Sequence, residues 1–174
     1  ARALRGLLVR HRIELLLLGC VLGGALALRL YRLGTVPANV TADEADNAQL
    51  AYRILAGRGP GPFGLDWQPS PVLDNYLQAF SMKAFGQGVV SLRLVSAVLS
   101  VIALVPFYFL ARQVVGRVAA LLGSCLLATS LWYLHFSRSG WESVEPALWA
   151  AAAALSLSLA LRHRSWLLYG LCGL

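Results

Sequence analysis

The residues with the clearest potential for chemistry are gathered in the segment Asp43-Glu44-Ala45-Asp46-Asn47. A carboxylate there could act as a general base toward an acceptor hydroxyl, or it could help to hold a divalent cation. Asp43 and Asp46 are three residues apart and would share a helical face, so one of them could orient the other. The structural alternative is that acidic residues in a first helical turn stabilise the helix dipole, by about 0.3–1 kcal/mol.

Arg138 is a second candidate, in the segment Phe136-Ser137-Arg138-Ser139-Gly140-Trp141-Glu142. A planar guanidinium can bind a phosphate through two parallel hydrogen bonds, so Arg138 could bind an anionic substrate. The alternative is an arginine at the membrane interface that pairs with Glu142, four residues on. Trp67 could stack on a sugar ring, and the alternative is that it anchors the chain at the membrane surface.

Histidine and cysteine give no pattern typical of a metal site. The three histidines are far apart, and the three cysteines fall within apolar runs without ligand-like spacing. We therefore assign no metal site and no cofactor, and a divalent cation at the acidic segment remains an open alternative.

The acidic segment needs a helix to position it, and the sequence predicts one that begins at this point. Thr41 and Glu44 form the capping-box pattern, with the N-cap hydroxyl three residues before the acid. Ala48, Ala51, Tyr52 and Leu55 follow at helical spacing, and Gly57 and Gly59 end the helix.

A second helix is predicted after an irregular stretch. Ser70 can cap it with Pro71 in the first turn, and Gly86 ends it. Its expected apolar face consists of Leu73, Tyr76, Leu77 and Phe80. We expect both helices to lie on the outer membrane surface, with their apolar stripes toward the lipid, as a roof over the membrane spans.

The composition places these helices on a membrane protein. The 174 residues are 58% hydrophobic and 13% charged, against about 45–50% and about 25% in soluble domains. Apolar runs long enough to cross about 30 Å of hydrocarbon must be helical. The sequence thus predicts an all-α polytopic protein, with residues 1–174 as the N-terminal part of one transmembrane module. The expected spans are 13–31, 92–111, 118–136 and 145–161, with a truncated fifth from 165.

Arginines set the expected orientation, because positive charge in short connecting segments marks the cytoplasmic side. They precede the first span, bracket the turn between the second and third, and fill the turn after the fourth: Arg2, Arg5, Arg10, Arg12, Arg112, Arg117, Arg162 and Arg164. Loop 32–91 and the segment 137–143 are then outside. The net charge of +7 is accounted for by these anchors, so we expect no nucleic-acid partner and a multi-pass protein of the cell membrane.

This combination resembles the GT-C class of polytopic glycosyltransferases, in the branch of the protein O-mannosyltransferases and aminoarabinose transferases. The resemblance is carried by Thr41-Ala42-Asp43-Glu44-Ala45, by Trp67 with Pro71-Val72-Leu73-Asp74-Asn75-Tyr76-Leu77, and by Phe136-Ser137-Arg138. It departs from the family at Gln68, where many relatives have Lys or His, and at the interrupted prolines Pro69-Ser70-Pro71.

The resemblance implies transfer of a sugar from a polyprenyl-phosphate donor, at the outer face of the lipid bilayer, to a hydroxyl of a protein, glycan or lipid acceptor. It makes Asp43 the catalytic carboxylate and places Arg138 near the carrier phosphate. We also expect Glu44, Asp46 and Trp67 to bind substrate. The alternative function is that of a non-catalytic membrane subunit within a larger complex. A transporter has less support, because no predicted span carries an acid near its middle.

Overall fold

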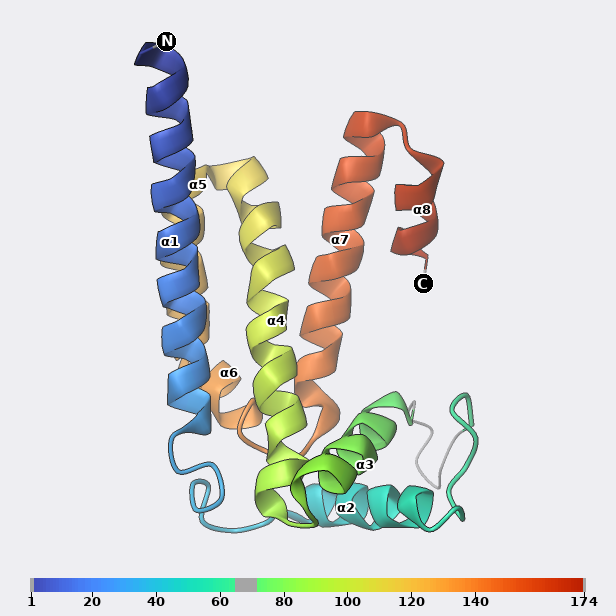
Figure 1. Ribbon diagram of the computed structural model, residues 1–174. Helices are drawn as coiled ribbons and strands as arrows, with labels where there is room; N and C mark the ends of the chain where they lie inside the picture. Colours follow the sequence, from blue (N-terminus) through green and yellow to red (C-terminus); the bar gives the residue numbers. More distant parts are fainter. Residues whose placement is uncertain (1, 65–71, 174) are drawn as a thin grey trace. The chain divides into compact units, whose positions relative to one another are not determined.

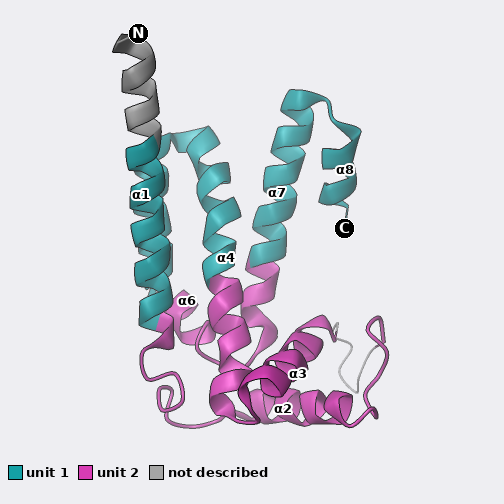
Figure 2. Ribbon diagram, in the orientation of Figure 1, with its two compact units in different colours: residues 1–28, 101–130, 148–174 teal, residues 29–100, 131–147 magenta. Residues whose placement is uncertain are grey.

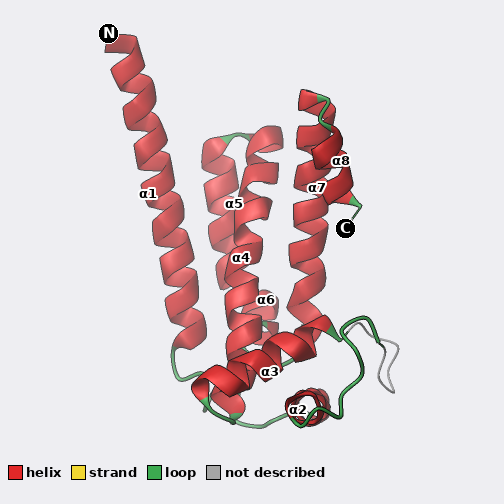
Figure 3. Cartoon of the chain, turned by 45° about the vertical axis from the view of Figure 1, so that its right-hand side comes forward, coloured by secondary structure: helices red, strands yellow, loops and turns green. Residues whose placement is uncertain are grey.

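The computed structural model describes residues 2–64 and 72–173, and within these ranges every regular element is helical (Figure 1). Loops and turns join the helices, as the colours of Figure 3 show. In chain order the elements are α1 (Arg2–Leu30), α2 (Ala42–Leu55), α3 (Leu73–Phe85), α4 (Val89–Val115), α5 (Arg117–Thr129), α6 (Leu131–Phe136), η1 (Glu142–Val144), α7 (Glu145–His163) and α8 (Trp166–Cys172).

Three helical stretches in the described part of the chain are long and apolar enough to cross a bilayer. They are Arg12–Leu30, Val89–Val115 and Glu142–His163. Each overlaps one of the predicted spans, and the protein is a polytopic helical membrane protein, as its sequence predicts.

The predicted span 118–136 differs, because the structure does not continue it as one helix. α5 ends at Thr129, and Ser130 has an extended backbone (φ −61°, ψ 137°) before α6 begins. The hydroxyls of Thr129 and Ser130 donate to the carbonyls of Cys125 and Leu127, at 2.8 and 3.1 Å. Such local bonds compete with the helical ladder. The 13 residues of α5 rise only about 20 Å, which is short of the hydrocarbon thickness.

The chain divides into two compact units (Figure 2). The span unit comprises residues 1–28, 101–130 and 148–174, and the loop unit comprises residues 29–100 and 131–147. Leu18, Tyr108 and Ala120 form a core cluster of the span unit. Ala51, Ala79, Met82 and Leu92 form one in the loop unit, where α2 packs against α3.

The span unit buries one acid near the end of its helices. Glu14 is 4% exposed, and its carboxylate lies 2.9 Å from Arg112 Nε and 3.5 Å from Arg117 Nη1. The Tyr108 hydroxyl donates to the same carboxylate. Two arginines expected to act as topological anchors therefore also neutralise a buried charge.

In the loop unit, the helix predicted to begin at Thr41 is confirmed as a helix, while its position on the membrane surface stays a prediction. Thr41 Oγ1 accepts a hydrogen bond from the Glu44 amide, and the Glu44 side chain accepts one from the Thr41 amide, both at 3.2 Å, so the capping box is complete. The helix ends just before Gly57, whose φ of +69° is one that glycine adopts at little cost.

The second surface helix begins at Leu73 and ends before Gly86, which has a φ of +92°. Its predicted cap, Ser70 with Pro71, lies outside the described residues. The buried positions are mainly polar: Asp74, Asn75, Gln78, Ala79, Ser81 and Met82. Leu73 and Phe80 of the expected apolar face are 44% and 70% exposed. α3 thus turns a largely polar face into the unit and leaves apolar side chains outward, and contact of those side chains with lipid stays a prediction.

Candidate active site

Glu44 is a buried carboxylate of the loop unit with four hydrogen bonds. Its side chain is fully buried. Oε1 accepts hydrogen bonds from Arg93 Nε and the Gly140 amide at 2.8 and 2.6 Å, and Oε2 accepts from Arg93 Nη2 and the Thr41 amide at 3.1 and 3.2 Å. Burial raises the pKa of Glu44, but these hydrogen bonds outweigh it and hold the pKa below its ordinary value. The buried carboxylate is therefore charged and joins α2 to α4 and to the segment before η1.

Arg93 completes this network from α4. It is 1% exposed, and besides Glu44 it donates to three backbone carbonyls, of Leu33, Pro37 and Asn39, at 3.1, 2.8 and 3.1 Å. One guanidinium thus binds both the acid at the start of α2 and the chain that leads from α1 into α2. The planar fork of arginine suits this task, because it offers five donors in fixed directions.

Asp43 has the opposite environment from its neighbour. It is exposed, whereas Asp46 and Asn47 are half-buried. Successive residues of a helix point about 100° apart, so the anchoring of Glu44 turns Asp43 outward. The acidic segment is consequently not assembled as one set of ligands. Among the residues that the structure describes, no group of three His, Cys, Asp or Glu side chains is suited to hold a metal ion.

Arg138 is buried rather than presented to solvent. It is 7% exposed, and Nη2 donates to the carbonyls of Tyr31 and Val36 at 2.6 and 2.9 Å. Burial, and then the nearby charge of Arg93, lower the pKa of Arg138. The carbonyls of Tyr31 and Val36 belong to the segment that follows α1. Contact of Arg138 with the carrier phosphate stays a prediction.

A chain of amide side chains connects α2 with α3 and with the segment that precedes α7. Asn47 Nδ2 donates to Gly140 O at 3.2 Å and to Glu142 Oε2 at 2.9 Å, and Asn75 Nδ2 donates to Asn47 Oδ1 at 3.1 Å. Gln78 Nε2 donates to Asp74 Oδ2 and, at 3.4 Å, to Gly140 O. Gly140 is therefore a point at which both α2 and α3 are held.

Asp74 is an unexpected acid in this interior. It is 1% exposed, and Gln78 donates to it from the next turn of α3. Burial raises the pKa of Asp74 well above its ordinary value, and the neighbouring carboxylates of Glu145 and Glu142 raise it further. The pKa of Asp74 is thus raised, whereas the pKa of Glu44 is lowered.

Comparison with known families decides where the chain belongs. A family model described as dolichyl-phosphate-mannose-protein mannosyltransferase matches residues 69–174. The chain is a member of this mannosyltransferase family. No match is found among curated proteins or among solved structures.

Membership of the mannosyltransferase family supports a membrane glycosyltransferase of the GT-C class that uses a polyprenyl-phosphate sugar donor. The matched range contains Arg93, Arg138 and the acids Asp74, Glu142 and Glu145. Asp43, Glu44 and Asp46 precede it, so their roles rest on the geometry of the loop unit and on the motif resemblance. Trp67 also precedes the match and lies outside the described residues.

The buried positions of two polar residues, Arg93 and Asp74, could not be predicted from the expected helices and spans alone. Arg93 looks like an interfacial arginine, although its position one residue inside the predicted span 92–111 is a signal that it needs a buried partner. Asp74 follows Leu73 of the expected apolar face in the sequence, and nothing local shows that the polar side of this helix turns inward.

Proposed function

We propose that this protein transfers a sugar, at the outer membrane face, from a polyprenyl-phosphate donor to a hydroxyl of a protein, glycan or lipid acceptor, with Asp43 as the general base. The observation that carries the proposal is the contrast between two adjacent carboxylates. Glu44 is fully buried and accepts four hydrogen bonds, while Asp43 is exposed at the start of the same helix. A carboxylate that must meet a substrate needs this combination of exposure and a fixed backbone.

In the proposed reaction, a carboxylate oxygen of Asp43 accepts the proton of the acceptor hydroxyl. The hydroxyl oxygen then forms a bond to the anomeric carbon of the sugar, and the bond from that carbon to the phosphate oxygen breaks. Polyprenyl phosphate leaves with the bonding electron pair. Proton removal in the transition state typically contributes about 10²–10⁴ to the rate.

The other candidate residues take separate places in this proposal. Glu44 and Arg138 act as positioning residues, because each holds a connecting segment through buried hydrogen bonds. Asp46, half-buried and one turn beyond Asp43, would orient the acceptor or the Asp43 carboxylate. Trp67 would stack on the sugar. We place the enzyme in the cell membrane, where its apolar helices would contact the polyprenyl tail.

The experiment compares the full-length wild-type protein with Asp43→Asn, using polyprenyl-phosphate mannose labelled in the sugar. Mannose is the first sugar to test because the family model names it. We expect Asp43→Asn to lower transfer at least about 100-fold. Gln49→Ala, at an exposed position of the same helix, is the matched control and should keep wild-type turnover.

Equal turnover by wild type and Asp43→Asn would refute the catalytic role of Asp43. Absence of turnover by the wild type with every sugar donor offered would instead favour a non-catalytic membrane subunit. A loss of transfer that accompanies a lower melting temperature would point to misfolding, so the thermal unfolding of each variant is measured beside its activity.

A further inference from the structure

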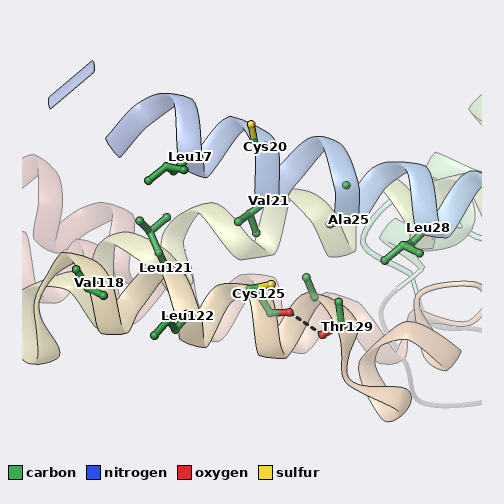
Figure 4. Close-up of a pocket in the computed structure, with 12 residues that line it drawn as sticks. Leu17, Cys20, Val21, Ala25, Leu28, Val118, Leu121, Leu122, Cys125 and Thr129 are labelled. Atoms are coloured by element: carbon green, nitrogen blue, oxygen red, sulfur yellow. Dashed lines mark hydrogen bonds between the residues drawn. The ribbon is translucent and has the colours of Figure 1, made fainter. Parts of the chain in front are cut away.

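Two openings among the described residues of the span unit have similar size but different chemistry. The first, of about 560 Å³, lies between α1 and α5. Leu17, Val21, Leu121 and Leu122 are among the apolar side chains that line it (Figure 4). Nothing in the structure indicates what covers this groove. The second opening is lined partly by polar and charged side chains, and their chemistry restricts the class of ligand that could bind there.

This second opening, the Arg112–Arg162 pocket, has a volume of about 590 Å³ and lies between α4 and α7. Phe109, Leu155 and Leu159 supply its apolar wall, and Arg112, Gln113 and Arg162 supply its polar wall. The volume falls within the range of about 300–1,000 Å³ that is typical of sites for small ligands. An occupant that satisfies both walls must be amphiphilic and anionic.

The polar wall is held in place by two contacts within the span unit. Ser158 Oγ donates to Gln113 Oε1 at 2.7 Å, which joins α7 to α4 beside the pocket. Arg112 Nε lies 2.9 Å from Glu14 Oε1. The Arg112 side chain is 26% exposed, and a guanidinium carries five N–H donors, so one contact with Glu14 does not exhaust its capacity to bind a second acceptor. Arg112 is therefore a fixed cation rather than a freely moving one.

Positively charged side chains predominate at the end of α4, the start of α5 and the end of α7. Arg112 and Arg117 share the one carboxylate of Glu14, and Arg162 and Arg164 add two exposed guanidinium groups at the end of α7. Basic pockets between membrane helices, on the side where arginines gather, are suited to anionic lipid head groups. Guanidinium groups bind phosphate oxygens in a matching planar geometry.

We propose that the Arg112–Arg162 pocket binds an anionic phospholipid. The phosphate lies between the two guanidinium groups, and the first carbons of the acyl chains run along Phe109, Leu155 and Leu159. The charge of the polar wall selects a lipid over an apolar helix of another chain, because an apolar helix would offer no anion to exposed Arg162 and no second acceptor to Arg112, which already pairs with Glu14. The apolar wall selects a lipid over free phosphate. This site is independent of the proposed sugar transfer.

The test measures lipid binding to the detergent-purified full-length protein by native mass spectrometry. Dioleoylphosphatidylglycerol is compared with dioleoylphosphatidylcholine, which has the same chains and no net charge. We expect the wild type to retain the anionic lipid preferentially. Arg162→Gln should bind it about fivefold more weakly. Arg164→Gln removes the same charge two residues away, from a side chain that does not line the pocket, and should stay within about twofold of wild type.

Two further measurements separate the sources of affinity. Glycerol 3-phosphate, the head group without chains, should not displace the bound lipid at equal concentration, because it cannot use the apolar wall. Leu159→Trp should reduce binding by filling the pocket, with thermal unfolding as the check on its fold. Equal binding of the two lipids, equal losses in the two arginine variants, or displacement by glycerol 3-phosphate would each overturn the proposal.

Discussion

Substitution of Glu44 by Gln tests whether the buried network positions the start of α2. Glu44 accepts four hydrogen bonds, two on each carboxylate oxygen. A glutamine of the same shape can keep Oε1 as the acceptor for Arg93 Nε and the Gly140 amide. Its Nε2 then replaces Oε2 and faces two donors, Arg93 Nη2 and the Thr41 amide. The substitution thus removes two acceptor contacts and the charge opposite a buried guanidinium.

The expected loss of stability follows from these contacts. A buried donor left without an acceptor costs about 1–3 kcal/mol, and breaking a buried ion pair costs about 3–5 kcal/mol. Arg93 still donates to the carbonyls of Leu33, Pro37 and Asn39, so we expect the lower part of that range, about 3 kcal/mol. For a chain of about this size, 3 kcal/mol corresponds to a decrease in melting temperature of about 6–12 °C.

Thermal unfolding in detergent measures this effect, and Asp43→Asn is the matched control. Asp43 is exposed in the first turn of the same helix, so its substitution should lower stability by no more than about 1 kcal/mol, or about 2–4 °C. The two substitutions would then have different effects: Glu44→Gln would lower stability, and Asp43→Asn would mainly lower turnover. A melting temperature of Glu44→Gln within 2 °C of wild type would refute the idea that this network holds the loop unit.

Two further substitutions probe the same unit. A Cβ on Gly140 would lie 2.5 and 2.7 Å from Cγ and Cδ2 of buried Leu92. Gly140→Ala should therefore lower the free energy of unfolding by about 1–3 kcal/mol. Gly88→Ala is the control, because no atom lies within 4 Å of its Cβ, and it should melt near wild type. Burial raises the pKa of Asp74 above its ordinary value of 3.8. Between these two pKa values the folded state keeps a proton on Asp74 that the unfolded state releases. The stability of the wild type therefore decreases as the pH rises from about 4 toward the raised pKa. Asp74→Asn cannot ionise and should melt above wild type at pH 8 but close to it at pH 4; parallel pH profiles for the two proteins would contradict this reasoning.

The helices with strong local signals could be predicted from the sequence. The capping box at Thr41, the stop at Gly86 and the long apolar runs all depend on residues close together in the chain. The break at Ser130 could not be predicted in the same way, because the residues around it are as apolar as those of a continuous span. A pair of hydroxyl-to-carbonyl bonds at Thr129 and Ser130 accompanies the break, but a bond of the same kind, from Ser124 to the carbonyl of Ala120, lies within the unbroken part of α5.

The orientation of α3 was harder to predict for a different reason. Hydrophobic periodicity identifies an apolar stripe, but it does not state whether that stripe faces protein or lipid. In a soluble protein Leu73 and Phe80 would be expected inside, whereas here they are 44% and 70% exposed. The polar side of α3 can turn inward because Asn47 and Gly140 offer partners to Asn75 and Gln78. These partners are distant in sequence, so local sequence patterns cannot predict the contacts.

The acidic segment shows why a motif identifies a site more readily than it assigns roles within it. Adjacent residues on a helix point about 100° apart, so two neighbouring carboxylates can have different environments. Here the capping box and Arg93 fix Glu44 inward, and Asp43 is exposed. The anchor for this arrangement comes from Arg93 and Gly140, which lie 49 and 96 residues away in the chain. An exposed acid is thus positioned by contacts that it does not itself make. A substitution that weakens the Glu44 network should therefore also disturb the direction in which the Asp43 carboxylate points.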